Sequence, residues 1–176
     1  ATGRLFVNGL SGVEGRLTAR RLSLAARVSK ASEIIRESSG PWLVWCGLNN
    51  EGRQLAQQLP DAALVEGSME LGEKVRQIGR FLDGSARVLI TKVKVAGFGL
   101  NLQHCSNVMF LGLSDSYEMY YQAIRRCWRY GQQNPVRVVV LTSDIEGVVL
   151  YNVLHKEAEH QATINARVER AAYYGA

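Results

Sequence analysis

Three arginines stand close together in the second half of the chain, at Arg125, Arg126 and Arg129. Arginine stays charged, and its planar guanidinium forms paired hydrogen bonds with phosphate or carboxylate oxygens. At helical period all three fall on one face with Glu118 and Gln122. Like charges this close repel by roughly 0.2–0.5 kcal/mol a pair. The pattern indicates an anion site, and a solvated basic face or carboxylate partners elsewhere in the fold remain the alternatives.

The segment that carries these arginines predicts one helix over residues 115–132. Asp115 can cap its start, Glu118 can complete a capping box, and Gly131 can supply the left-handed stop. The opposite face is apolar, and its aromatic side chains are expected to pack on the core rather than to stack on bases. This apolar face consists of Tyr117, Tyr120, Tyr121, Ile124, Cys127 and Trp128.

A second stretch suited to anion binding runs over residues 92–102 and contains two lysines and a Gly-x-Gly element. Glycines let a backbone approach a phosphate closely, and lysines attract one as point charges. A Gly-x-Gly loop alone is weak evidence, because an ordinary turn between a strand and a helix has the same composition. The stretch is therefore a candidate phosphate contact, with such a turn as the alternative.

Short apolar runs alternate with amphipathic segments along the chain, which predicts strands alternating with helices. No tight hairpin signal separates the strands, so we expect an α/β fold with a parallel sheet covered by helices on both faces. Ligands of such sheets bind at the carboxyl ends of the strands. The predicted strands are 42–46, 63–65, 87–91, 108–111 and 136–141. The predicted helices are 18–38, 50–59, 71–82 and 115–132, with one long helix or two over 145–172.

The composition is that of an ordinary globular chain with a basic balance. The 176 residues are 47% hydrophobic and carry a net charge of +5, which favours a polyanionic partner. No apolar run approaches the roughly 18 residues that a membrane span needs, so no membrane partner is expected. Cys46, Cys105 and Cys127 lack metal-ligand spacing, which predicts buried reduced thiols and no metal site. A zinc site at His104 and Cys105 is disfavoured, because adjacent ligands without a second pair do not form a finger.

Residues 122–132, Gln-Ala-Ile-Arg-Arg-Cys-Trp-Arg-Tyr-Gly-Gln, resemble motif VI of superfamily-2 helicases. Every fixed position of the form found in Swi/Snf-type DNA translocases and related phage helicases, Gln-Ala-x-x-Arg-x-x-Arg-x-Gly-Gln, is present. The resemblance implies a RecA-like helicase C-terminal domain with Gln122, Arg126 and Arg129 as catalytic residues. In this family the two arginines reach a nucleotide bound by a neighbouring domain. Arg126 and Arg129 are thus the implied arginine fingers, and Arg125, offset by one position, is expected to matter less.

Residues 96–102 resemble motif V of the same family, Ala-Gly-x-Gly-x-Asn-Leu. In the family this loop touches both the nucleotide and the nucleic-acid backbone. The resemblance therefore implies that Gly99 and Asn101 bind the nucleotide, and that Lys92 and Lys94 bind nucleic acid. Asn101 stands where many RNA helicases carry aspartate, which favours DNA as the partner.

Two weaker matches extend the implied nucleic-acid surface. Residues 42–50 resemble motif IV, and Asn49 is either a backbone contact or an ordinary N-cap of the next helix. Gly67 and Ser68 follow the second predicted strand, at a place where the family contacts the nucleic-acid backbone.

The chain carries only the second half of such a motor. The sequence nearest to a phosphate loop, residues 67–75, has its lysine one place late and Val75 where a magnesium-binding hydroxyl is required. No Asp-Glu pair follows an apolar strand either. We therefore expect ATP and Mg²⁺ to be held mainly by an N-terminal RecA-like domain of the same polypeptide, and this fragment alone to be inactive. Residues 1–15 are expected to be an irregular lead-in, and residues 16–176 a single domain.

Three functions are compatible with these patterns. The first is the second motor domain of an ATP-dependent helicase or translocase, cytoplasmic in a bacterial or phage setting, or otherwise intracellular. The second is a non-catalytic nucleic-acid-binding module with a RecA-like fold, which would not need both finger arginines. The third is a flavodoxin-like domain for a small phosphorylated ligand, which gives no reason for motifs V and VI to occur together.

Overall fold

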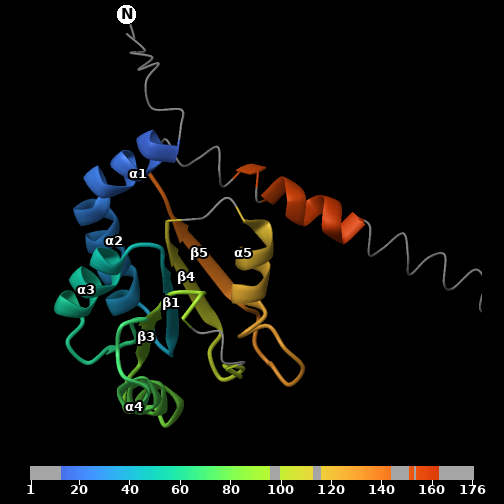
Figure 1. Ribbon diagram of the computed structural model, residues 1–176. Helices are drawn as coiled ribbons and strands as arrows, with labels where there is room; N and C mark the ends of the chain where they lie inside the picture. The colour runs from blue at the N-terminus through green and yellow to red at the C-terminus, as the bar shows by residue number, and fades with distance from the viewer. Residues whose placement is uncertain (1–12, 96–99, 113–115, 144–150, 153, 163–176) are drawn as a thin grey trace, which may run out of the picture.

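Five parallel strands form the centre of the molecule in the computed structural model (Figure 1): β1 (Trp42–Cys46), β2 (Ala63–Leu64), β3 (Val88–Thr91), β4 (Asn107–Leu111) and β5 (Arg137–Leu141). Their order in the sheet is β2-β3-β1-β4-β5. The central strand β1 pairs in parallel with both β3 and β4, so that Val44 lies opposite Ile90 and Met109. The structure describes residues 13–95, 100–112, 116–143, 151–152 and 154–162.

Helices cover both faces of this sheet: α1 (Val13–Leu22), α2 (Leu24–Glu37), α3 (Asn49–Gln58), α4 (Leu71–Leu82) and α5 (Tyr117–Ile124). Successive side chains of β1 alternate between two cores. Trp42 and Val44 pack with residues of α2 and α3, while Leu43 and Trp45 pack with residues of α4 and α5. Central strands that are buried on both faces have to be continuous apolar runs, which is why the sequence predicts this α/β class correctly.

The helix predicted over residues 18–38 is two helices, α1 and α2, which separate at Ser23. In a continuous helix the carbonyl of Arg20 would accept a hydrogen bond from the amide four residues later. Here the oxygen accepts hydrogen bonds from Nη2 of Arg27 at 2.6 Å and from Oγ of Ser23 at 3.4 Å. Side-chain donors have replaced the helical bond, so the chain can turn at this point. Because α1 begins at Val13, residues 13–15 are helical and not part of an irregular lead-in.

The helix that leads toward the arginines starts one residue later than predicted. Ser116 is its N-cap, and Oγ of Ser116 accepts a hydrogen bond from the amide of Met119 at 3.2 Å. The predicted cap, Asp115, lies outside the described residues. A serine side chain satisfies an open amide of the first turn as an aspartate would, but the N-cap is Ser116, so the prediction of Asp115 for this role was wrong.

The same helix also ends earlier than predicted. α5 stops at Ile124, and residues 125–131 follow as turns and bends. The apolar face of the predicted helix therefore does not continue to its end. Trp128 is 51% exposed, against the expectation that it packs on the core, whereas Tyr120 is 6% exposed and does.

The last described segment is helical at residues 151–152 and 154–162, within the one long helix or two predicted over residues 145–172. No helix among the described residues is long and apolar enough to cross a membrane.

Candidate nucleotide and nucleic-acid interface

Three arginines come together at one open groove of about 470 Å³, although the helix on which they were expected ends before them. Among the described residues, no carboxylate lies within ion-pair distance of any of the three. The groove therefore concentrates positive charge that the described part of the chain does not neutralise, which suits an external polyanion. We call this hollow the arginine groove, and it is lined by Tyr121, Gln122, Arg125, Arg126 and Arg129.

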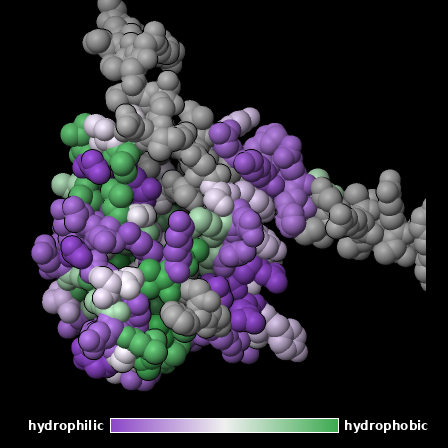
Figure 2. Space-filling model, in the orientation of Figure 1, coloured by the Kyte–Doolittle hydropathy of each residue, from purple (hydrophilic) through white to green (hydrophobic). Residues whose placement is uncertain are grey.

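Gln122, the first fixed position of the predicted motif VI, lies on α5 at the wall of the arginine groove. Its Nε2 donates a hydrogen bond to Oε1 of Glu118 at 3.0 Å. Glu118 is the acidic residue of α5 nearest to the groove, one helical turn before Gln122, and this hydrogen bond engages its carboxylate. Figure 2 shows a strongly hydrophilic surface over the α5 side of the molecule, in keeping with a groove that faces water.

The turns that present the arginines are tied to the segment that ends the predicted motif V. The amide of Leu102 donates a hydrogen bond to the carbonyl of Arg126 at 3.0 Å. Nε2 of Gln132, the last fixed position of motif VI, donates to the carbonyls of Cys105 at 3.1 Å and Cys127 at 3.3 Å. These three bonds fix the backbone of the arginine turns against a neighbouring segment, so the two predicted motifs form one structural unit.

Two buried thiols fill the space beneath this unit. Cys105 and Cys127 have no exposed surface, and Sγ of Cys105 donates hydrogen bonds to the carbonyls of Pro41 at 3.4 Å and Asn107 at 3.2 Å. The interaction with the Cys127 thiol lowers the pKa of Cys105, although burial opposes the shift, and the same interaction together with burial raises the pKa of Cys127. Burial also raises the pKa of Cys46. All three cysteines are buried free thiols, as predicted, and they pack as small apolar groups.

A second hollow, of about 380 Å³, lies at the carboxyl ends of the central strands, where ligands of parallel sheets bind. Its lining includes the predicted nucleic-acid contacts Lys92 and Lys94, which follow β3. Neither lysine forms an ion pair with another described residue. We call this hollow the strand-end pocket; Arg20, Gly47 and Gly112 also line it.

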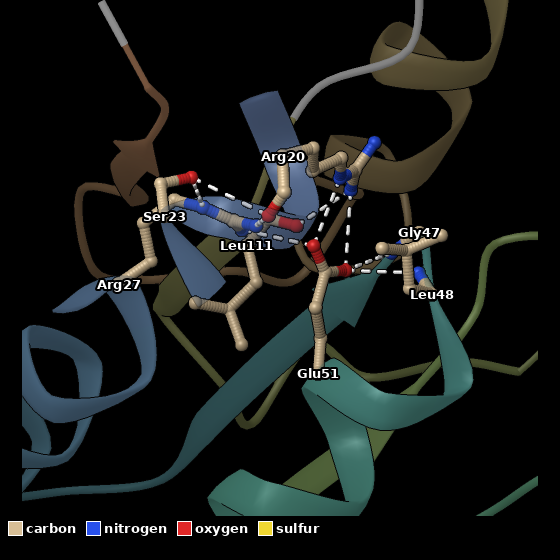
Figure 3. A network of polar contacts seen from close by, with 7 residues as sticks. All are labelled: Arg20, Ser23, Arg27, Gly47, Leu48, Glu51 and Leu111. Atoms are coloured by element: carbon tan, nitrogen blue, oxygen red, sulfur yellow. Dashed lines mark hydrogen bonds and ion pairs between the residues drawn. The ribbon is translucent and has the colours of Figure 1, made fainter. Parts of the chain in front are cut away.

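One carboxylate holds two arginines of the amino-terminal helices beside the strand-end pocket (Figure 3). Oε1 of Glu51 accepts hydrogen bonds from Nε of Arg20 at 2.8 Å and from Nη1 of Arg27 at 2.9 Å. Oε2 accepts from the amides of Gly47 at 2.8 Å and Leu48 at 2.9 Å. Burial raises the pKa of Glu51, but the hydrogen bonds and charges of Arg20 and Arg27, with the Leu48 amide, outweigh it and leave the pKa lowered. The carboxylate therefore stays ionised in the interior because its donors satisfy it.

The same carboxylate determines how α3 begins. Leu48 occupies the N-cap position, and its side chain cannot accept a hydrogen bond, so Glu51 in the first turn of the helix provides the acceptor for the neighbouring amides. Asn49 is consequently the first helical residue and not the N-cap that was one of its two predicted roles. The Asn49 side chain is exposed beside Lys92, at a small hollow that both residues line.

The guanidinium of Arg20 lies against two glycines at the ends of β1 and β4. A Cβ on Gly47 would lie 2.1 Å from Nη2 of Arg20, and a Cβ on Gly112 would lie 2.4 Å from its Cζ. Nη2 of Arg20 also donates to the carbonyl of Leu111 at 2.7 Å. Gly112 has a φ of +80°, a backbone conformation that favours glycine in its own right. Arg20 can join α1 to two strand ends only because these positions have no side chain.

The other predicted site residues fall in two places. Gly67 and Ser68 are exposed after β2, and a Cβ on Gly67 would lie 3.5 Å from Cγ2 of Val95, in the turn that carries the two lysines. Asn101 is exposed and precedes the residue whose amide bonds to the arginine turns. Gly99 lies outside the described residues. The structure thus brings the predicted nucleic-acid residues to the carboxyl edge of the sheet, and Asn101 to the arginine turns.

Residues 67–75 do not form a phosphate loop. α4 begins at Leu71, and Nζ of Lys74 donates a hydrogen bond to the carbonyl of Gly67 at 2.8 Å, so this lysine is bonded to its own backbone turn. Within the described ranges, no three histidine, cysteine, aspartate or glutamate side chains come together as metal ligands.

The sequence interpretation missed Arg20, Arg27 and Glu51 as a unit. The two arginines are separated from the glutamate by 31 and 24 positions, so only the folded chain brings them together. One partial signal was available: Glu51 lies three residues after Leu48, the spacing at which a capping-box carboxylate stands. That signal locates a helix start and does not identify the cations that meet there.

The five-stranded parallel sheet with helices on both faces places the molecule in the RecA-like class of α/β domains. Within that class, the chain belongs to the family of helicase conserved C-terminal domains, which matches residues 26–131. The resemblance to superfamily-2 helicases that was inferred from motifs V and VI is thereby confirmed.

Relatives of known identity agree with this assignment. The ATP-dependent DNA helicase DDM1 of Arabidopsis thaliana is 33% identical over 101 residues, which are 54% of this chain and 13% of that protein. The chain thus spans only a small part of the length of this curated relative. The C-terminal part of the Fun30 ATPase domain has the same fold, with a TM-score of 0.62 at 20% identity over 72% of this chain and 44% of that one. The C-terminal domain of the DEAD-box protein Dbp5 gives a TM-score of 0.65 at 18% identity over 77% of this chain and 80% of that one.

Proposed function

We propose that this chain is the second motor domain of an ATP-dependent DNA helicase or translocase. In this proposal the arginine groove faces ATP that is held by an N-terminal RecA-like domain of the same polypeptide. The observation that carries the proposal is the groove itself, where three arginines converge without a carboxylate partner among the described residues.

The chemistry of phosphoryl transfer explains why such a groove is useful. Charge spreads over the oxygens of the transferring phosphoryl group, and an arginine supplied from a second domain stabilises it. We assign this role to Arg126 and Arg129, with Gln122 at the wall of the groove, and we assign nucleotide binding to Gly99 and Asn101 of motif V. Mg²⁺ has no ligand cluster among the described residues, so we assign its ligands to the other domain, as for the phosphate loop.

The carboxyl edge of the sheet is the proposed nucleic-acid surface. Lys92 and Lys94 supply positive charge there after β3, Asn49 is exposed at the start of α3, and Gly67 and Ser68 are exposed after β2. Phosphate contacts of this kind bind any sequence and weaken as salt rises. The name of the DDM1 relative, a DNA helicase, and the asparagine at position 101 support DNA as the substrate.

The test is nucleic-acid-stimulated ATP turnover by the complete enzyme carrying Arg126→Ala or Arg129→Ala. We expect turnover to fall by on the order of 10³–10⁵, because the term lost is that of an arginine finger. Arg129→Lys should also fail, since a point charge does not reproduce the planar fork. The matched control is Arg76→Ala, which removes an exposed arginine of α4 that pairs with Glu73 and should leave turnover unchanged.

Melting temperature is measured on the same variants. A large loss of turnover at an unchanged melting temperature supports the finger role. Full turnover in both alanine variants rejects the proposal. DNA binding without ATP turnover in the unmodified complete protein would favour the alternative, a non-catalytic nucleic-acid-binding module.

A further inference from the structure

We infer that Arg125 is a third phosphate-binding arginine of the groove, held in place by the rings of Tyr121 and Trp128. The inference rests on the proposed function, because it assigns Arg125 to the nucleotide that Arg126 and Arg129 are proposed to reach. It reverses the sequence expectation that Arg125 matters less.

That expectation came from the family motif, in which Arg125 stands one position before the first fixed arginine. A position in a motif does not say where the side chain lies in the folded chain. α5 ends at Ile124, and Arg125 is the residue that closes it, with φ of −61° and ψ of −13°. The chain then turns, and Arg125 lines the same hollow as Arg126 and Arg129.

Two aromatic rings hold the Arg125 guanidinium. Its Cζ lies 5.8 Å from the ring centroid of Tyr121 and 5.5 Å from that of Trp128. Each contact is of the cation–π type, which favours a guanidinium over the face of the ring. Tyr121 comes from α5 and Trp128 from the turns that follow it, so the clamp spans both parts of the groove.

This geometry leaves the donors of Arg125 available. Rings contact a guanidinium through its flat faces, whereas its five N–H groups point outward in the plane. Among the described residues, the Arg125 side chain donates no hydrogen bond and forms no ion pair. A charged group that is pre-positioned with free donors loses little conformational entropy when an anion binds.

The exposure of Trp128 supports the same role. A tryptophan that is 51% exposed contributes only part of its surface to a core, and the prediction that it packs there was wrong. Trp128 is one of the two rings that contact Arg125, and it has to lie at the open side of the groove because a ligand enters there. The ligand that suits three guanidinium groups around about 470 Å³ is a triphosphate.

The experiment measures steady-state kinetics of ATP hydrolysis and DNA affinity in the complete enzyme. For Arg125→Ala we expect the KM for ATP to rise roughly 10-fold or more, as the loss of a charge-assisted hydrogen bond would produce, with kcat much less affected. Trp128→Ala should raise the KM for ATP by a smaller factor. Trp128→Phe should leave the KM close to that of the unmodified enzyme, because a ring face is kept. The matched control is Arg137→Ala, since Arg137 lies 5.5 Å from the ring of Trp42 at the start of β5, away from the groove.

The outcomes separate this inference from the proposed function. An unchanged KM in Arg125→Ala, while Arg126→Ala and Arg129→Ala lose kcat, overturns the inference and leaves the function standing. A fall in melting temperature with an unchanged KM assigns the clamp to folding alone and also overturns the inference. A weaker affinity for DNA with an unchanged KM for ATP would place nucleic-acid phosphates, not the nucleotide, against Arg125. Unchanged kinetics in all three arginine variants rejects both proposals.

Discussion

Arginines meet opposite environments at two places in this domain. In the amino-terminal network, Arg20 and Arg27 are 12% and 5% exposed and share the carboxylate of Glu51. In the arginine groove, Arg125 and Arg129 are exposed, and no described carboxylate forms an ion pair with either of them. The network satisfies its charges within the fold, whereas the groove leaves its charges for a ligand.

The physical difference between the two places is desolvation. A charge that is removed from water has to be paired and hydrogen-bonded, and removing its partner is strongly destabilising. A charge at an open groove keeps its hydration, so its neighbours add little to folding stability. Substitutions in the network should therefore change the free energy of unfolding, and substitutions in the groove should change catalysis.

The largest effect on stability is expected for Glu51→Gln. The amide is uncharged, so the buried guanidinium of Arg27 loses the charge of the carboxylate with which it pairs, and Arg20 loses its ion pair with the same carboxylate. Breaking a buried pair in this way costs about 3–5 kcal/mol. Urea unfolding followed by circular dichroism measures the loss.

Glu66→Gln is the matched control for that substitution. Glu66 pairs with Arg53, whose side chain is 53% exposed, so the expected loss is below about 1 kcal/mol. Equal losses in the two variants would show that burial does not distinguish the network from an ordinary surface pair.

Lowering the pH should reduce the stability that the Glu51 network contributes before it changes the arginine groove. The pKa of Glu51 in the folded chain is below its ordinary value of 4.5, so folding favours the deprotonated carboxylate. The stability that Glu51 contributes is fully present above pH 4.5 and is lost as the pH falls below it. Unfolding free energy measured from pH 7 to pH 3 should fall more steeply in the unmodified chain than in Glu51→Gln, and parallel curves would contradict this assignment.

A smaller effect is expected for Gly112→Ala. An L-residue at a φ of +80° is strained by roughly 1–2 kcal/mol, and the new Cβ would also displace the Arg20 guanidinium from its position 2.4 Å away. Gly79→Ala is the control, because a Cβ there has nothing within 4 Å and lies inside α4, where alanine is favoured over glycine. We expect a fall in melting temperature for the first variant and none for the second.

The sheet and most helix positions could be predicted because they depend on local patterns. Residues 42–46 and 108–111 are apolar throughout, as strands that are covered on both faces have to be. The break at Ser23 could not be predicted, because the donor that replaces the helical bond belongs to a side chain whose own position depends on Glu51. Periodicity gives the face on which a residue lies, and it does not detect a long-range contact that ends a helix.

The structure brings the three predicted catalytic residues to one groove, but on a backbone that differs from the predicted helix. The family resemblance identified Gln122, Arg126 and Arg129, and all three line the groove. The helix that was expected to carry them ends early, where the Leu102 amide bonds to the Arg126 carbonyl. Arg125 lines the groove as well, and the sequence interpretation set it aside only because it stands one position before the first fixed arginine of the motif.

The smallest effect on stability is expected for Arg129→Ala in the groove. Arg129 is exposed, and its side chain forms no ion pair or hydrogen bond with another described residue. The bonds that hold its turn come from backbone groups and from the Gln132 amide, which the substitution leaves in place. A surface change of this kind alters the free energy of unfolding by no more than about 0.5 kcal/mol. Urea unfolding of this variant beside Glu51→Gln provides the comparison, and a loss above roughly 1 kcal/mol for Arg129→Ala would mean that the groove arginine is paired within the fold and not kept for a ligand.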